Sequence, residues 1–242
     1  QITENINSFL VGATVVLFTD TIPDTLTFGE DHWYKSKQIA FPGKNYTLRV
    51  SHTDFEEALS GDAFPSPVSF KLENFVARDI VNDWGDYFSS IDVVFNDDPY
   101  RNDFYEVKAK IGAIVRKESN GIFSGGTRSN DIVLKNEGYT EGIYTDDMAF
   151  SDALFNGDTC SLNIHFAYND NVDYVYIILR SVSENYYRYK KSLYRYEVNS
   201  FSNILNSSNP VGLYSNIENG YGIFAGYSET VDSMYTYSEQ HE

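Results

Sequence analysis

The sequence has very little cysteine and no long apolar run. Cys160 is the single cysteine among 242 residues, so an intrachain disulfide and a thiolate zinc cluster are both excluded. No stretch of about 18 apolar residues occurs, which argues against a membrane-spanning helix. The chain begins with the polar segment Gln1–Asn5 and shows no signal peptide. With 242 residues, the chain is long enough to bury a sizeable core.

Basic residues are also scarce relative to acidic ones. Lys and Arg total 18 against 35 Asp and Glu, which gives a formal net charge of −17 at pH 7. Such a surface repels phosphate backbones and anionic membrane surfaces, so nucleic acid is not an expected partner. The simplest interpretation of the acidity is solubility in a crowded environment.

Aromatic residues are abundant instead, and apolar residues alternate with polar ones in several segments. The clearest is Tyr105–Val115, where Tyr105, Val107 and Ala109 share one face and Glu106 and Lys108 the other. This period of two is typical of strands with one buried face. We expect an all-β fold with an antiparallel sandwich. The other expected strands are Gly12–Phe18, Thr25–Phe28, Tyr46–Ser51, residues 68–72, residues 91–95, residues 162–168 and Tyr174–Leu179.

Two modules are expected along the chain, residues 1–62 and residues 63–242. The segment Ser60–Pro67 is interpreted as the linker, because its prolines cannot lie inside a central strand and hold their preceding residues extended. The order of Gly12–Val15 and then Pro42–Val50 looks like a small immunoglobulin- or transthyretin-like module. The larger antiparallel β-sandwich is expected to follow the linker.

One amphipathic helix, near residues 184–198, interrupts the β pattern. Ser183 can cap it. One stripe of the helix is aromatic and the other side basic, so we expect the stripe to pack and the basic side to remain available to an acidic partner. The stripe is Tyr186, Tyr189, Leu193 and Tyr196, and the basic residues are Arg188, Lys190, Lys191 and Arg195.

The segment Tyr214–Tyr227, named here the closing segment, combines aromatics with Gly220, Gly222 and Gly226. Glycines in this pattern permit close backbone approach, so we expect the closing segment to pack on the sheet and on the helix, and the alternative is a loop that faces a ligand. Together with Phe150–Gly157 and Tyr186–Leu193 it resembles the signature of a family of outer-membrane lipoproteins of Bacteroidota, catalogued as a domain of unknown function (number four-two-four-nine).

The resemblance implies a location and a partner. It implies a cell-surface protein of the outer membrane, attached to the membrane only by a lipid anchor upstream of Gln1. The implied partner is a TonB-dependent outer-membrane receptor, to which the protein would deliver a nutrient such as a glycan or a peptide. It implies no reaction and no cofactor.

Residues able to support catalysis or metal binding form no recognisable pattern. Three acidic loops suggest calcium, but turn-forming Asx residues explain them as well, so no metal site is predicted. The four histidines share no triad or metal spacing, and His165 is expected to be solvated on the polar face of its strand. Cys160 is interpreted as a small buried side chain. The acidic loops are Asn96–Asp103, Asp146–Asp147 and Asn169–Asp173, and the other histidines are His32, His52 and His241.

Aromatic residues in turn-like contexts are the best candidates for ligand binding. Trp33 and Tyr34, and Trp84 with Tyr87, lie beside acidic residues, and sugar rings stack on such side chains while carboxylates bind hydroxyls. The alternative is that both tryptophans fill the ends of the core. We expect a non-catalytic protein that binds a nutrient, and the alternative function is a structural or adhesive surface protein that binds other proteins.

Overall fold

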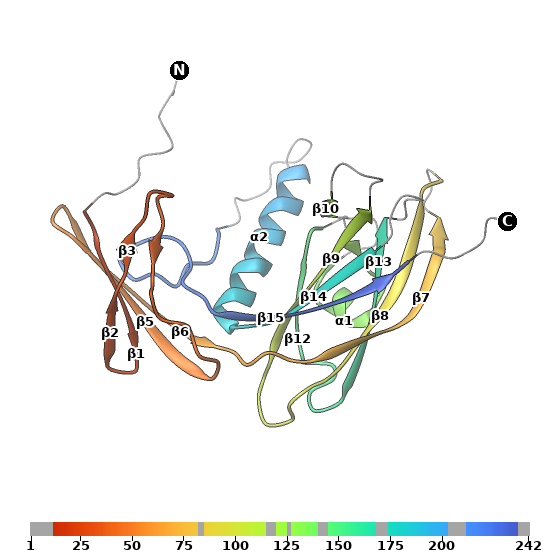
Figure 1. Ribbon diagram of the computed structural model, residues 1–242, viewed down its shortest axis with the longest axis horizontal. Helices are drawn as coiled ribbons and strands as arrows, with labels where there is room; N and C mark the ends of the chain where they lie inside the picture. Colours follow the sequence, from red (N-terminus) through yellow and green to blue (C-terminus); the bar gives the residue numbers. More distant parts are fainter. Residues whose placement is uncertain are drawn as a thin grey trace, which may run out of the picture. The chain divides into compact units, whose positions relative to one another are not determined.

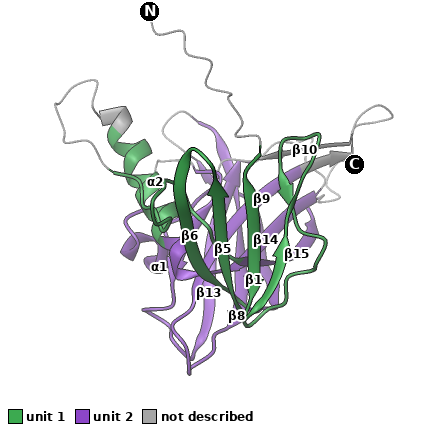
Figure 2. Ribbon diagram, turned by 90° about the vertical axis from the view of Figure 1, so that its left-hand side faces the viewer, with its two compact units in different colours: residues 1–65, 188–226 green, residues 66–187, 227–242 purple. Residues whose placement is uncertain are grey.

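The computed structural model describes residues 12–81, 85–114, 120–124, 127–139, 145–167, 174–202 and 212–236. The chain forms two compact units, coloured separately in Figure 2. Unit 1 combines residues 1–65 with 188–226, and unit 2 combines residues 66–187 with 227–242. The first unit thus takes a second segment from far along the chain, in addition to the continuous module expected from the sequence. Both units are built of antiparallel sheets, as the alternation predicts.

Unit 1 contains a four-stranded antiparallel sheet in the order β2-β1-β5-β6 and a short hairpin of β3 and β4 (Figure 1). Val15, Val16 and Tyr46 form its buried apolar centre. The expected strand Thr25–Phe28 is divided between β2 and β3 at Leu26, whose N–H still donates to the Val15 carbonyl of β1 at 2.8 Å. The strands are β1 (Thr14–Thr19), β2 (Ile22–Thr25), β3 (Thr27–Phe28), β4 (Tyr34–Lys35), β5 (Lys44–His52) and β6 (Phe55–Phe64).

The expected linker Ser60–Pro67 is wrong in its first half. Strand β6 continues to Phe64, with Ser60 opposite Leu48 and Gly61 opposite Thr47. Pairing with β5 outweighs the poor strand propensity of Ser, Gly and Asp, because each ladder position satisfies backbone groups that would otherwise lack partners. Only residues 65–69 lie between β6 and the first strand of unit 2.

Unit 2 is a sandwich of two antiparallel sheets. One has the order β10-β9-β14-β15, with β12 also paired to β9, and the other has the order β11-β13-β8-β7. The strands are β7 (Phe70–Val81), β8 (Tyr87–Asn96), β9 (Phe104–Ile114), β10 (Asn120–Ser124), β11 (Thr127–Arg128), β12 (Met148–Ser151), β13 (Thr159–Ala167), β14 (Tyr174–Val182) and β15 (Tyr227–Tyr235).

The core of unit 2 lies between these two sheets. Tyr105, Val107 and Ala109 of β9 are buried, so the predicted inward face of this strand is confirmed. The ring of Phe95 on β8 lies 4.9 Å from that of Tyr105, and 6.5 Å from that of Phe150 on β12. Aromatic rings at these separations join the two layers through both area burial and ring–ring attraction.

Two helices occur among the described residues. Helix α1 (Ile132–Asn136) was not predicted, and the Asp131 carboxylate caps it by accepting the Val133 N–H at 2.9 Å. Helix α2 (Glu184–Ser202) agrees with the expected helix. It begins where Ser183 Oγ accepts the Tyr186 N–H at 3.2 Å, which confirms the predicted cap.

The expected division of α2 into a buried aromatic stripe and a basic side is wrong at two positions. Tyr196 of the stripe is exposed, whereas Lys191 of the basic side is only 6% exposed. The Lys191 ammonium lies 5.9 Å from the centre of the Tyr194 ring, so the cation keeps a favourable partner while its stem is covered. The basic side is therefore not a uniform solvent-facing surface.

The closing segment has no regular strand up to Gly226 and packs on β6 within unit 1. Leu59 and Glu218 exchange two backbone hydrogen bonds, of 3.3 and 2.8 Å. A Cβ added to Gly226 would lie 2.4 Å from the carbonyl oxygen of Ala63, so only glycine fits there. The expected contact with the helix is present as a hydrogen bond of 2.9 Å from the Tyr214 N–H to Ser192 Oγ. The sheet is thus the more extensive of the two partners.

Within the described part of the chain, neither helix has the length and apolar character needed to cross a membrane.

Candidate functional site

The residues 27–35 form a tight hairpin, named here the Trp33 hairpin. Phe28 of β3 pairs with Tyr34 of β4. In the turn, the Gly29 N–H donates to the Trp33 carbonyl at 2.8 Å and the His32 N–H donates to the Gly29 carbonyl at 3.0 Å. His32 has a positive φ of 63°, a conformation that histidine adopts more readily than most residues. These bonds fix the backbone that carries Trp33.

Side chains hold the same hairpin from both sides. The Phe28 ring lies 4.9 Å from that of Tyr34, and the Tyr34 hydroxyl donates to the Ala13 carbonyl at 3.3 Å. Lys35 forms an ion pair with Asp31, and this hydrogen-bonded ammonium lowers the pKa of the Asp31 carboxyl. The hairpin is therefore held by contacts that do not involve the indole of Trp33.

The indole of Trp33 projects into solvent, with 69% of the residue exposed. The interpretation of this tryptophan as a filler of the core is therefore wrong, since a core side chain loses nearly all of its accessible surface. Tyr34 is half-buried and has a structural hydrogen bond. Trp33 is thus exposed to solvent, whereas Tyr34 supports the hairpin that carries it. Ligand binding by either residue stays a prediction.

The second predicted pair belongs to unit 2. Tyr87 opens β8 and is 47% exposed, with the Arg78 guanidinium 5.6 Å from the centre of its ring. Trp84 lies outside the described residues. Tyr87 and the Trp33 hairpin belong to different units, so each is a separate candidate.

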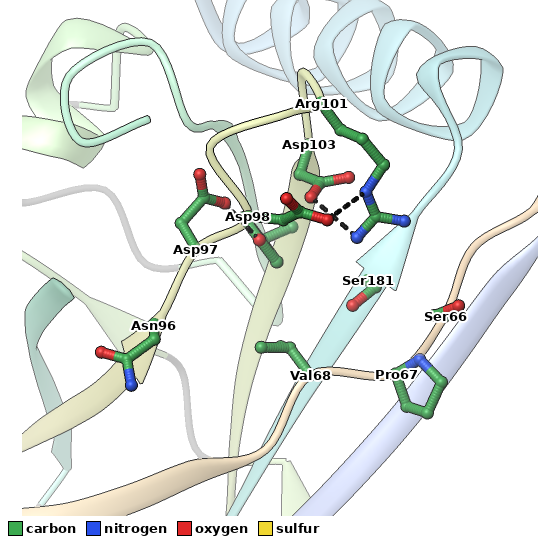
Figure 3. Close-up of a pocket in the computed structure, with 10 residues that line it drawn as sticks. Ser66, Pro67, Val68, Asn96, Asp97, Asp98, Arg101, Asp103 and Ser181 are labelled. Atoms are coloured by element: carbon green, nitrogen blue, oxygen red, sulfur yellow. Dashed lines mark hydrogen bonds and ion pairs between the residues drawn. The ribbon is translucent and has the colours of Figure 1, made fainter. Parts of the chain in front are cut away.

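A small polar pocket opens in unit 2, with a volume of about 190 Å³. It lies where β8 leads into β9, beside the chain entering β7 and the end of β14 (Figure 3). Sites for drug-sized ligands are usually above about 300 Å³, so this pocket suits a small group instead of a sugar chain. Its lining residues are Ser66, Pro67, Val68, Asn96, Asp97, Asp98, Arg101, Asp103, Tyr105 and Ser181.

Most carboxylates of this pocket already have structural roles. The Tyr105 hydroxyl donates to Asp97 Oδ1 at 2.5 Å and the Gly157 N–H donates to Asp97 Oδ2 at 2.9 Å. Arg101 pairs with Asp98 at 3.0 Å and with Asp103 at 3.2 Å. Such bonds fix the loop that joins β8 to β9.

Burial and crowding disfavour charge on two of the nearby acids. Burial raises the pKa of the Asp103 carboxyl, although the Arg101 guanidinium partly offsets the effect. Burial likewise raises the pKa of Asp152, and the neighbouring Asp97 adds to this rise. Asp152 Oδ2 accepts the Asp103 N–H at 2.6 Å, so the two acids are linked. Asp97, Asp103 and Asp152 therefore repel one another in this corner of unit 2 when they are ionised.

The acidic loops do not assemble a metal site among the residues that the structure describes, where no group of three His, Cys, Asp or Glu side chains is placed to hold an ion. In the first loop, Asp98 Oδ1 accepts the Tyr100 N–H at 3.1 Å, the geometry of an Asx turn. In the second, Asp147 pairs with Lys108 at 3.0 Å. The third loop, Asn169–Asp173, lies outside the described residues.

His165 and Cys160 lie on opposite faces of β13, and both are buried. Cys160 is buried in the core as predicted, and burial raises the pKa of its thiol to about 12, which makes it a poor nucleophile at neutral pH. The expectation that His165 is solvated is wrong, because only 4% of it is exposed. Its cross-strand neighbours Arg128 and Ser90 are buried too, so this part of the outer face is covered.

A buried charge cluster in unit 2 was not predicted. Glu106 is fully buried on the face of β9 that alternation assigns to solvent. Its carboxylate accepts the Tyr186 hydroxyl at 3.0 Å and pairs with Arg180 at 2.9 Å, and Arg180 also pairs with Glu229 at 2.9 Å. Because Tyr186 and Arg180 hydrogen-bond to the Glu106 carboxylate, its negative charge is tolerated in the interior. The cluster ties the first turn of α2 to the sheet, so its role is structural.

The fold and the Trp33 hairpin define an all-β protein of two units that displays an indole on a rigid turn. Residues 1–233 match the model of the family described as "Domain of unknown function (DUF4249)", and the chain belongs to this family. No curated protein and no solved structure matches the chain.

Proposed function

We propose that the protein is a non-catalytic, lipid-anchored protein of the bacterial cell surface that binds a nutrient, a glycan or a peptide, for a TonB-dependent outer-membrane transporter. The observation that carries the binding role is the exposed indole of Trp33 on a hydrogen-bonded hairpin. An apolar ring held rigidly in water gains contact area with a ligand at little entropic cost.

Neighbouring side chains of the hairpin suit a carbohydrate. Glu30, Asp31 and His32 are all exposed around Trp33. Sugars are recognised by a ring stacked on an aromatic face, with polar groups at the rim that bind hydroxyls. The hairpin offers both kinds of contact within the segment Glu30–Trp33.

The proposed absence of catalysis is supported by the use of the acidic residues. Asp97, Asp98 and Asp103 in the pocket hold backbone groups, Tyr105 or Arg101. A general acid or base must exchange a proton with a substrate, whereas these carboxylates line a small pocket and are held by ion pairs and hydrogen bonds of the loop. The proposed outer-membrane location and the transporter partner rest on the sequence motifs that resemble those of the lipoprotein family.

The test is a glycan and peptide array probed with the whole chain and with Trp33→Ala. We expect Trp33→Ala to weaken binding to any positive ligand by at least about tenfold, as for a central aromatic contact. Phe55→Ala is the matched control, because Phe55 is a similarly exposed aromatic residue of unit 1 in a different hairpin. Equal binding by Trp33→Ala and the unaltered chain overturns the role of the hairpin.

The alternative, an adhesive or structural protein, is favoured by a different observation. Ile22, Ile39 and Phe41 of unit 1 are all more than half exposed, and the buried centre of a protein interface is more apolar than the rest of a protein surface. A pull-down of surface proteins other than the TonB-dependent transporter separates the two functions, because the nutrient-binding function also involves the transporter. If Ile39→Asp abolishes a protein complex and Trp33→Ala leaves it intact, the alternative holds.

A further inference from the structure

The pocket of unit 2 contains a hydroxyl group, that of Ser181, for which the described residues provide no hydrogen-bond partner. Ser181, near the end of β14, lines the pocket and is only 6% exposed. Its side chain forms no hydrogen bond with the described residues. Directly across the strand pair, Ser228 Oγ is also buried without a hydrogen bond to them. The Ser181 hydroxyl is not one of the completely buried side-chain atoms without a partner among the described residues, so it opens into the pocket, where a polar group from outside the chain can reach it.

The charge around this hydroxyl determines the kind of group. Among the residues that line the pocket, the Arg101 guanidinium pairs with Asp98 and Asp103, whereas Asp97 accepts hydrogen bonds from Tyr105 and Gly157. Arg101 contacts the Oδ2 atoms of Asp98 and Asp103, which leaves accepting capacity on Asp103 Oδ1. The raised pKa of the Asp103 carboxyl has burial as its main cause, with repulsion from Asp97, Asp152 and Asp98 adding to it. A cation in the pocket would relieve this repulsion.

We propose that this pocket binds a primary ammonium group, carried by a lysine side chain or a free chain N-terminus of a peptide. The volume of about 190 Å³ admits an ammonium and a short stem but not a folded segment. An ammonium offers three donors, and Asp103 Oδ1, Asp98 and the Ser181 hydroxyl are acceptors on the walls of the pocket, as Figure 3 shows for these residues. The site is independent of the Trp33 hairpin, so either proposal can fail alone.

The first experiment follows backbone amide shifts of the isotope-labelled whole chain during titration with three capped tripeptides. One carries a free lysine amine and an acetylated N-terminus, the second only a free N-terminus, and the third has both amines acetylated. We expect the amide signals of Asp103 and Ser181 to shift with the lysine peptide, with the peptide that has a free N-terminus, or with both. The peptide that causes the shifts identifies the source of the ammonium. Shifts of the same size with the third peptide, or no shifts with any, overturn the proposal.

Two variants and one control give a second test. Asp103→Asn removes a charged acceptor and is expected to weaken binding by about tenfold or more, whereas Ser181→Ala, which leaves every ion pair intact, is expected to weaken it by about threefold to tenfold. Asp158→Asn is the matched control, since it removes an exposed carboxylate near the pocket that does not line it. Unchanged affinity in Ser181→Ala overturns the proposal even if Asp103→Asn fails to fold. Calcium ions that displace the peptide and reproduce its shifts would show a metal site instead.

Discussion

The two units use aromatic residues in opposite ways. In unit 2, the rings of Phe95, Tyr105 and Phe150 are buried together between two sheets. In unit 1, Trp33 and Phe41 are largely exposed, and the buried centre is small. A sandwich has an interior that accepts bulky rings on two facing layers, whereas a four-stranded sheet with a short hairpin offers little such space. Aromatic content alone therefore does not indicate whether a side chain stabilises the fold or meets a ligand.

The largest effect is expected in the core of unit 2. Phe150 is completely buried and contacts the rings of Phe95, Tyr105 and Phe155. Phe150→Ala loses these contacts and leaves a cavity, so the free energy of unfolding should fall by about 3–5 kcal/mol. The measurement is a urea melt, followed in parallel by alkylation of Cys160, which is buried in the same unit.

Phe41→Ala is the control for that substitution, because it removes the same side chain from an exposed position of unit 1. It should change the free energy of unfolding by no more than about 0.5 kcal/mol. Similar losses in both variants would contradict the contrast between the units.

A smaller loss is expected where the closing segment meets β6. A methyl group at Gly226 would approach the carbonyl oxygen of Ala63 to 2.4 Å, so Gly226→Ala must displace backbone. We expect a loss of about 1–3 kcal/mol, as for other overpacked positions. Gly212→Ala serves as the comparison, since no atom lies within 4 Å of its added Cβ. If a thermal melt finds the two variants equal, the closing segment does not pack on β6 in solution.

The next effect tests the buried charge cluster of unit 2. Tyr186→Phe deletes the hydroxyl that donates to Glu106 at 3.0 Å and keeps the ring. Because Arg180 still pairs with that carboxylate, the expected loss is limited to about 1–2 kcal/mol in a urea melt. Tyr221→Phe, on a fully exposed ring, should have no measurable effect. A Tyr186→Phe variant as stable as the unaltered chain would mean that water replaces the hydroxyl at no cost.

Strand positions were predictable where alternation was regular. Tyr105–Val115 was predicted as a strand and β9 runs from Phe104 to Ile114, because a period of two directly reflects one buried face. The same pattern misplaced Glu106 and His165, since it assigns one face to solvent and does not say what later segments cover. Burial on the second face depends on contacts between residues far apart in the chain.

The geometry of the candidate sites could not be predicted for the same reason, since it depends on contacts that the local sequence pattern does not specify. The sequence identified Trp33 as a candidate but left open whether its side chain is exposed or fills the core. The exposure depends on the hydrogen bonds of the hairpin turn, and these join residues that show no periodic pattern in the sequence. The sequence predicted a linker at Ser60–Pro67 because prolines cannot lie inside a central strand, whereas pairing with β5 extends β6 as far as Phe64, directly before Pro65. The pocket beside Ser181 was not predictable, because it joins β14 to a loop that lies about eighty residues earlier.

The smallest effect on stability is expected at Trp33 itself, where the contrast between the units is most direct. The turn is held by the hydrogen bond from the Gly29 N–H to the Trp33 carbonyl and by the contact between the rings of Phe28 and Tyr34. An alanine at position 33 retains this backbone hydrogen bond. Since 69% of Trp33 is exposed, Trp33→Ala should change the free energy of unfolding by no more than about 0.5 kcal/mol. Urea melts of Trp33→Ala and Phe150→Ala, run side by side, compare the two losses in the free energy of unfolding. A loss above about 2 kcal/mol would mean that the indole packs against the protein in solution, and the hairpin would then be part of a core and not a surface for binding.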